Sequence, residues 1–140
     1  MNTNALTRIS DENPTYSSLV PTTRKEKVAF YNAVESPEFR LNAFINKEFE
    51  FSNVYMEKTL IAEKDEEGNP TGVMHDAVKI VFITPDNKGI LSTSMGILRS
   101  LYGIFSIFGT PDTWEDEPMK VVVKQVELGK NRTFRLEVVD

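Results

Sequence analysis

Basic side chains alternate with apolar residues in several predicted strands. A lysine or arginine that points outward from a strand can contact the phosphate groups of a nucleic acid, and an aromatic ring beside it can stack on bases. Because stacking tolerates any base, this pair of residue types is typical of sequence-independent binding to single strands. Four candidate cations lie within predicted strands and two lie at a strand end and in a turn: Lys79, Lys124, Arg132, Arg135, Lys58 and Lys88. The alternative for each is an ordinary solvated surface charge.

Aromatic residues supply the candidates for stacking. Tyr55 is the first choice, because its neighbours on both sides are apolar and fill the core face, so its ring should point outward. Trp114 is flanked by acidic residues that would repel phosphate, and we expect it to anchor its loop. The remaining stacking candidates are Tyr31 and Phe39, and the adjacent Arg40 can contact phosphate beside Phe39.

Residue types for catalysis or metal binding are scarce. The chain has no cysteine and one histidine, His75, which excludes thiolate nucleophiles and sites built from several histidines. Asp65, Glu66 and Glu67 are consecutive, but they lack the ligand spacing of a calcium loop, and we interpret them as a solvated hairpin tip. We therefore predict a non-enzymatic protein with no catalytic residues, no metal site and no cofactor.

Length and composition predict one globular domain. The chain has 140 residues, 40% of them hydrophobic, and a formal net charge of −5. This length supports a hydrophobic core. The acidic balance makes nucleic-acid binding less expected without excluding a local basic groove. We assign residues 24–140 to the domain.

Residues 1–23 are polar, contain two prolines and lack a signal-peptide pattern. They predict a flexible N-terminal arm on an intracellular protein. The alternative is an arm that mediates self-association by docking on a neighbouring subunit through its apolar residues, Leu6, Ile9, Tyr16 and Leu19.

Residues 94–109 predict an amphipathic helix that must cover a sheet. Ser94 can cap its start and Gly109 can end it. Gly96 and Gly103 weaken helix propensity and predict close packing against a neighbour. A membrane span needs about 20 apolar residues, so this helix predicts no membrane association. Its apolar stripe consists of Ile97, Leu98, Leu101, Ile104, Phe105 and Phe108.

Alternating apolar residues predict five strands around this helix, over residues 47–62, 73–84, 90–93, 119–127 and 132–139. Residues 25–34 predict an additional N-terminal strand. In the strand over 47–62, Phe49 and Phe51 share one face, whereas the later apolar residues Val54 and Met56 have the opposite parity. A slip of one residue requires a bulge, here near Ser52. A long strand that bends there can contribute to both sides of a small barrel.

The order of these elements is strand, strand, strand, helix, strand, strand. It predicts an all-β or α+β fold built on a five-stranded OB-like barrel, with the helix between strands three and four and an extra N-terminal strand. The alternative is a more general α+β sheet with a packed helix.

Several segments also carry a family resemblance. They are residues 29–33 (AFYNA), residues 51–58 (FSNVYMEK), the DNKG turn at 86–89 with its flanking strands and helix, and residues 120–139 (KVVVKQVELGKNRTFRLEVV). In these segments and their order the chain resembles the single-stranded DNA-binding proteins of small, protein-primed phages of Gram-positive bacteria. The resemblance implies an OB-like module that coats displaced strands during phage DNA replication, without catalysis. Its partners would be single-stranded DNA and phage replication proteins, in the cytoplasm of the infected bacterium. The alternative function is a non-enzymatic OB-like module for protein interaction within a phage assembly.

Overall fold

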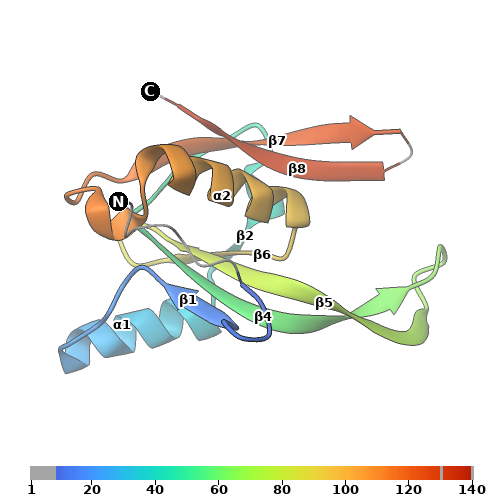
Figure 1. Cartoon of the computed structure of the whole chain (residues 1–140), viewed down its shortest axis with the longest axis horizontal. Helices are drawn as coiled ribbons and strands as arrows, with labels where there is room; N and C mark the ends of the chain where they lie inside the picture. The colour runs from blue at the N-terminus through green and yellow to red at the C-terminus, as the bar shows by residue number, and fades with distance from the viewer. Residues whose placement is uncertain (1–8, 130, 140) are drawn as a thin grey trace.

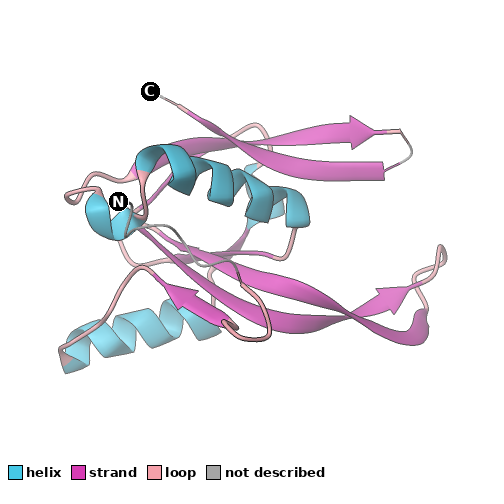
Figure 2. Cartoon of the chain, viewed as in Figure 1, coloured by secondary structure: helices cyan, strands magenta, loops and turns pink. Residues whose placement is uncertain are grey.

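The computed structural model describes residues 9–129 and 131–139, which form two β-sheets and two α-helices (Figures 1 and 2). A five-stranded sheet has the order β1-β4-β5-β6-β2, and a three-stranded sheet has the order β3-β7-β8. The fold is therefore α+β and mostly β, as predicted at that level. The strands are β1 (Thr15–Ser17), β2 (Phe39–Arg40), β3 (Glu48–Phe51), β4 (Asn53–Lys64), β5 (Pro70–Ile83), β6 (Gly89–Ser92), β7 (Met119–Leu128) and β8 (Asn131–Val138).

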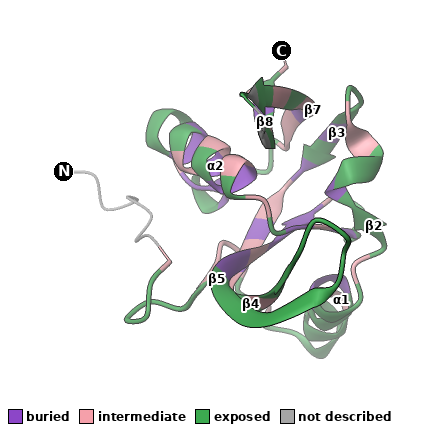
Figure 3. Ribbon diagram, turned by 90° about the vertical axis from the view of Figure 1, so that its right-hand side faces the viewer, coloured by how far each residue is buried: buried purple, intermediate pink, exposed green. Residues whose placement is uncertain are grey.

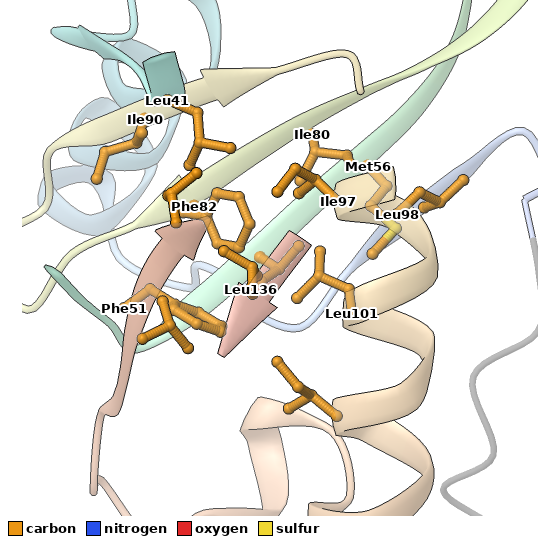
Figure 4. Packing of buried hydrophobic residues seen from close by; sticks show 14 of the residues in the cluster. Leu41, Phe51, Met56, Ile80, Phe82, Ile90, Ile97, Leu98, Leu101 and Leu136 are labelled. Atoms are coloured by element: carbon orange, nitrogen blue, oxygen red, sulfur yellow. The ribbon is translucent and has the colours of Figure 1, made fainter. Parts of the chain in front are cut away.

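Helix α2 (Met95–Phe108) is the predicted amphipathic helix. Ser94 Oγ accepts a hydrogen bond from the Ile97 amide, and Gly109 ends the helix, as expected. The apolar stripe of α2 faces both sheets, and Figure 4 shows Ile97, Leu98 and Leu101 pointing toward side chains of β4, β5 and β8. The main core thus lies between the two sheets and α2.

The long predicted strand is confirmed as a segment with a slip, but it divides at Ser52. Phe51 before the break and Val54 after it are both fully buried, so the change of parity is real. β3 pairs with β7 in one sheet, whereas β4 pairs with β5 in the other. One continuous stretch of chain therefore contributes to both sheets, as the bend predicted.

Residues 25–34 are not a strand, and this prediction was wrong. They belong to helix α1 (Arg24–Glu35), which begins with a capping box between Thr23 and Glu26. Phe30, Ala33 and Val34 follow helical spacing and turn toward the sheet. Helix α1 covers the face of the five-stranded sheet that lies away from α2, where Ala33 packs with Val81 and Ile83.

The sheets do not close into the predicted barrel. Within the described chain, β6 pairs with β5 and β2, and β8 pairs with β7, so no ladder joins β6 to β8. The open edges of β6 and β8 are each covered by another element. The parallel strand β2 lies on β6, while Ser100 Oγ of α2 accepts a hydrogen bond from the Leu136 amide at the edge of β8, at 3.0 Å.

Gly96 lets α2 approach β8 closely, as its position predicted. A Cβ atom on Gly96 would clash with the Phe134 carbonyl oxygen and with Thr133 Oγ1. The same expectation for Gly103 was wrong, because a Cβ atom there would meet no atom within 4 Å. The contact at Gly96 fixes the start of α2 beside β8.

Part of the predicted flexible arm is packed on its own chain. Thr15–Ser17 forms β1, which pairs with β4 from Tyr55 to Glu57. Ile9 and Tyr16 pack against the main core, and the Ile9 amide donates a hydrogen bond to the Tyr102 hydroxyl at 3.1 Å. These two side chains therefore do not form an arm that is free to dock on a neighbour. Leu6 lies outside the described residues.

Among the described residues, neither α-helix combines the length and the apolar character that crossing a membrane requires.

Candidate nucleic-acid interface

Tyr55 points away from the main core, as predicted, but α1 partly covers its ring. Its side chain lies under α1, where its ring contacts Phe30 edge-on with centroids 5.9 Å apart. Its hydroxyl donates a hydrogen bond to Glu57 at 3.2 Å. Burial beneath α1 and the nearby Glu57 carboxylate raise the pKa of Tyr55 above its usual value. Tyr55 is thus part of a second small core between α1 and the sheet.

Three of the predicted cations have carboxylate partners. Lys58 contacts Asp11, and it also lies 3.4 Å from Asp76. The hydrogen bond with Asp11 is the main cause of a raised pKa for the Lys58 ammonium group. The other two pairs are Lys79 with Glu35 of α1 at 3.8 Å and Lys88 with Glu38 at 3.2 Å. Phosphate would have to displace these carboxylates, so the three lysines are poor first contacts for a nucleic acid.

The outer face of the β7–β8 hairpin carries the next two candidates. Lys124 and Arg135 are directly opposite one another in the ladder. Arg135 forms an ion pair with Glu137 at 2.9 Å, whereas Lys124 contacts only the side-chain oxygen of Asn46, at 3.5 Å, among the described residues. Of these two residues, Lys124 is therefore the one without an ion pair among the described residues.

Arg40 and Arg132 both lie where the two sheets stay unpaired, between β6 and β8. They line one hollow of about 520 Å³ between β6 and β8, which we call the seam hollow. Neither arginine forms an ion pair with another described residue, although Arg132 is opposite Glu127 in the ladder. The rest of the lining consists of Leu41, Asn42, Leu91, Ser92, Thr93, Ser94, Met95, Thr133 and Phe134.

The aromatic candidates lie outside the seam hollow. Tyr31 is on the outer face of α1 and is 65% exposed. Phe39 packs edge-on against Phe44, with centroids 5.7 Å apart, and lines a different hollow next to Lys88. Trp114 is a loop anchor, as predicted: its indole N–H donates to the carbonyls of Phe108 and Gly109, at 3.1 and 3.0 Å. The structure therefore separates most predicted aromatic residues from the free cations.

The seam hollow also holds residues that the sequence analysis did not select. They are Asn42, the polar run Ser92–Thr93–Ser94, and Thr133, all of which can donate hydrogen bonds to an anion. The sequence contained a signal for some of these residues. The helix cap at Ser94 places the start of α2, with its free amide groups, next to Ser92 and Thr93 in the chain. No local sequence pattern places Arg40 and Asn42 in the same hollow as the start of α2.

Two hairpins project at the end of the molecule where the seam hollow lies. The turns between β4 and β5 and between β7 and β8 point in the same direction, and Figure 3 views both from that end. Arg132 is the second residue of β8 and so lies next to its hairpin turn. The hollow is thus near the base of a fork made by two β-ribbons.

Nothing in the described part of the chain resembles a metal centre, since no three His, Asp or Glu side chains are grouped as ligands. His75 is exposed on β5, in agreement with its interpretation as a surface residue. No family model, no curated protein and no solved structure matches this chain.

Proposed function

We propose that this protein binds single-stranded DNA with little sequence preference, and that phosphate groups of the strand enter the seam hollow. The observation that carries this proposal is the meeting of Arg40 and Arg132, remote in sequence, in one hollow without a carboxylate partner among the described residues. An arginine can form two parallel hydrogen bonds with a phosphate group. Two such side chains suit a site that holds a phosphate backbone.

The start of α2 supports the same proposal. The first turn of this 14-residue helix carries no acidic side chain. Its amide groups give the helix start a partial positive charge that attracts anions. Ser94 and Asn42 add neutral polar groups to the wall of the hollow. The site therefore combines fixed charge with hydrogen-bond donors.

The strand order supports placing the DNA near the two hairpins. In an OB barrel, nucleic acids contact the second and third strands and the loops that follow the first and fourth strands. The ladders β6-β5-β4 and β3-β7-β8 have the order expected of such a barrel opened at one seam. In that alignment the two contact loops are the turns of the β4–β5 and β7–β8 hairpins. Helix α1 covers the outer face of β5 and β6, so the DNA strand cannot lie on that face. We place the DNA strand in the seam hollow.

The biological setting that we propose follows the family resemblance. The protein coats displaced single strands during the replication of a small protein-primed phage, together with other phage replication proteins, in the cytoplasm of the infected bacterium. It performs no catalysis in this role. Binding of this type is strongly salt-dependent, because it releases counterions from the phosphates.

The test is a fluorescence anisotropy titration with a labelled oligothymidylate of about 16 nucleotides, within the range of one OB fold. We expect Arg40→Ala/Arg132→Ala to bind at least about a hundredfold more weakly, since each of the two charged hydrogen bonds contributes roughly 1.5–3 kcal/mol. The slope of log K against log salt should also fall by about 0.7 for each lost phosphate contact. Arg99→Ala is the matched control, because Arg99 is exposed on α2 outside the hollow. Equal affinities for the double variant and the control would refute this site.

The protein-interaction module stays as the second candidate, because four predicted cations are already paired with carboxylates. If the wild-type protein fails to bind the oligonucleotide even at about 50 mM salt, where phosphate binding is strongest, this second function is the one to pursue.

A further inference from the structure

The outer half of the β4–β5 hairpin is a two-stranded ribbon with nothing packed on it. From Ala62 to Asp76 every residue is exposed. Three large apolar side chains are open to solvent here: Leu60 is 58% exposed, Val73 51% and Met74 52%. Both edges of the ribbon are also free within the described chain, since β1 reaches only Glu57 of β4 and β6 reaches only Ile80 of β5. Figure 3 shows this ribbon as an exposed loop that extends toward the viewer.

An isolated two-stranded ribbon is at best marginally stable in water, and free edges with apolar side chains are sites of association. The ribbon nevertheless has a well-formed tip. Asp65 Oδ1 accepts hydrogen bonds from the amides of Glu67 and Asn69, both at 2.9 Å. An ordered ribbon with exposed apolar residues offers a surface on which another protein chain can dock.

The charge of the tip indicates which partner. Because Asp65 is occupied within the turn, the carboxylates of Glu63, Glu66 and Glu67 are the ones that face solvent. At the same end of the molecule, the seam hollow presents Arg40 and Arg132 without ion-pair partners among the described residues. The acidic tip of one copy is therefore complementary to the basic hollow of another.

We propose that two copies of this chain associate about a two-fold axis at this end, so that the acidic tip of each ribbon enters the seam hollow of the other. Such an isologous contact is the commonest form of a dimer, because one pair of complementary surfaces is used twice. The association also covers Leu60 and Met74, which share one face of the ribbon. This inference uses the hollow of the proposed function but goes beyond it: the acidic tip competes with DNA phosphate, so the dimer is the DNA-free form.

The test is sedimentation velocity of the full chain without DNA, at low and high salt. We expect a dimer at low salt that dissociates as salt screens the charged contact. The charge reversals Glu66→Lys/Glu67→Lys and Arg40→Glu/Arg132→Glu should each weaken the homodimer at least tenfold. Mixing the two variants should restore a dimer, because both contacts of the mixed pair are again complementary. The matched control is Glu115→Lys/Glu117→Lys, which changes two exposed carboxylates in another loop.

Three results would overturn the proposal: a monomer at low salt at every concentration, a dimer that neither reversal weakens, or two reversed variants that stay monomeric when mixed. If Arg40→Glu/Arg132→Glu fails to fold, Arg40→Gln/Arg132→Gln replaces it as the test of the hollow. The variant Glu66→Lys/Glu67→Lys separates this inference from the proposed function. It keeps the hollow intact, so it should bind the oligonucleotide at least as well as the wild type while losing the dimer.

Discussion

Two regions of the molecule carry similar side chains with opposite consequences. Under α1, Tyr55 packs on Phe30 and Lys79 pairs with Glu35, so ring and cation are both occupied. In the seam hollow, Arg40 and Arg132 face an opening that exists because β6 and β8 do not pair. The element that covers a strand therefore decides whether its cations are paired with carboxylates or left without them.

The largest expected effect separates these two regions directly. Lys79→Ala/Lys88→Ala should change the affinity for an oligothymidylate less than twofold, since both lysines already have carboxylate partners. The corresponding loss for Arg40→Ala/Arg132→Ala is at least about a hundredfold, from two charged hydrogen bonds. Anisotropy titrations of both variants at one salt concentration measure the difference. A greater loss for the lysine variant would reverse the comparison and place the DNA beside these two lysines.

The next effect concerns the contact that holds α2 against β8. Gly96→Ala should lower the free energy of unfolding by about 1–3 kcal/mol, because the added methyl group overlaps Phe134 and Thr133. Gly103→Ala is the matched control on the same helix and should raise it by about 0.5–1 kcal/mol, since its methyl group meets open space. Urea denaturation checks both values. Equal effects at the two positions would show that α2 does not press on β8.

A smaller effect is expected at Tyr55. Tyr55→Ala should lower the free energy of unfolding by roughly 1–2 kcal/mol, because it removes an aromatic pair and part of the core under α1. Its affinity for the oligonucleotide should stay within twofold of the wild type. Thermal denaturation and anisotropy on the same sample measure the two quantities. A stable variant that has lost DNA affinity would restore Tyr55 as a stacking residue.

The last effect is confined to alkaline pH and concerns Tyr16. Burial against the core, together with the negative charge of Asp112, raises the pKa of Tyr16 from 10.0 to about 12. The unfolded chain therefore loses this proton at lower pH than the folded chain, and the stabilisation present below pH 10 is lost as the pH rises toward 12. Over that interval the wild type should lose more stability than Tyr16→Phe, as followed by urea denaturation at each pH. Parallel curves for the two proteins would contradict the assignment.

Local patterns in the sequence were sufficient for most elements. The cap at Ser94, the stop at Gly109 and the change of parity around Ser52 each depend on neighbouring residues, and each was found in the structure. The error at residues 25–34 arose because a short apolar pattern fits both a strand and a helix. The capping box of Thr23 and Glu26 was the signal that could have decided between them.

The candidate site was harder to predict from the sequence, because residues far away in the chain decide whether each cation has a carboxylate partner. Lys58 is paired with Asp11, which lies 47 positions earlier in the chain. Between β6 and β8 the sheets stay unpaired: a two-residue strand covers β6, a single glycine admits α2 to β8, and neither feature has a periodic signature. Cations could therefore be selected by type, but not by whether they were free.

The open seam gives the molecule a mechanical degree of freedom. Within the described chain no backbone hydrogen bonds tie β6 to β8, so side-chain packing and the start of α2 set the width between them. Packing contacts tolerate small displacements that a hydrogen-bonded ladder resists, and the edge amides of β8 should consequently exchange with solvent sooner than those of β5. The gap can thus adapt its width to what occupies it, while the remainder of each sheet keeps its register.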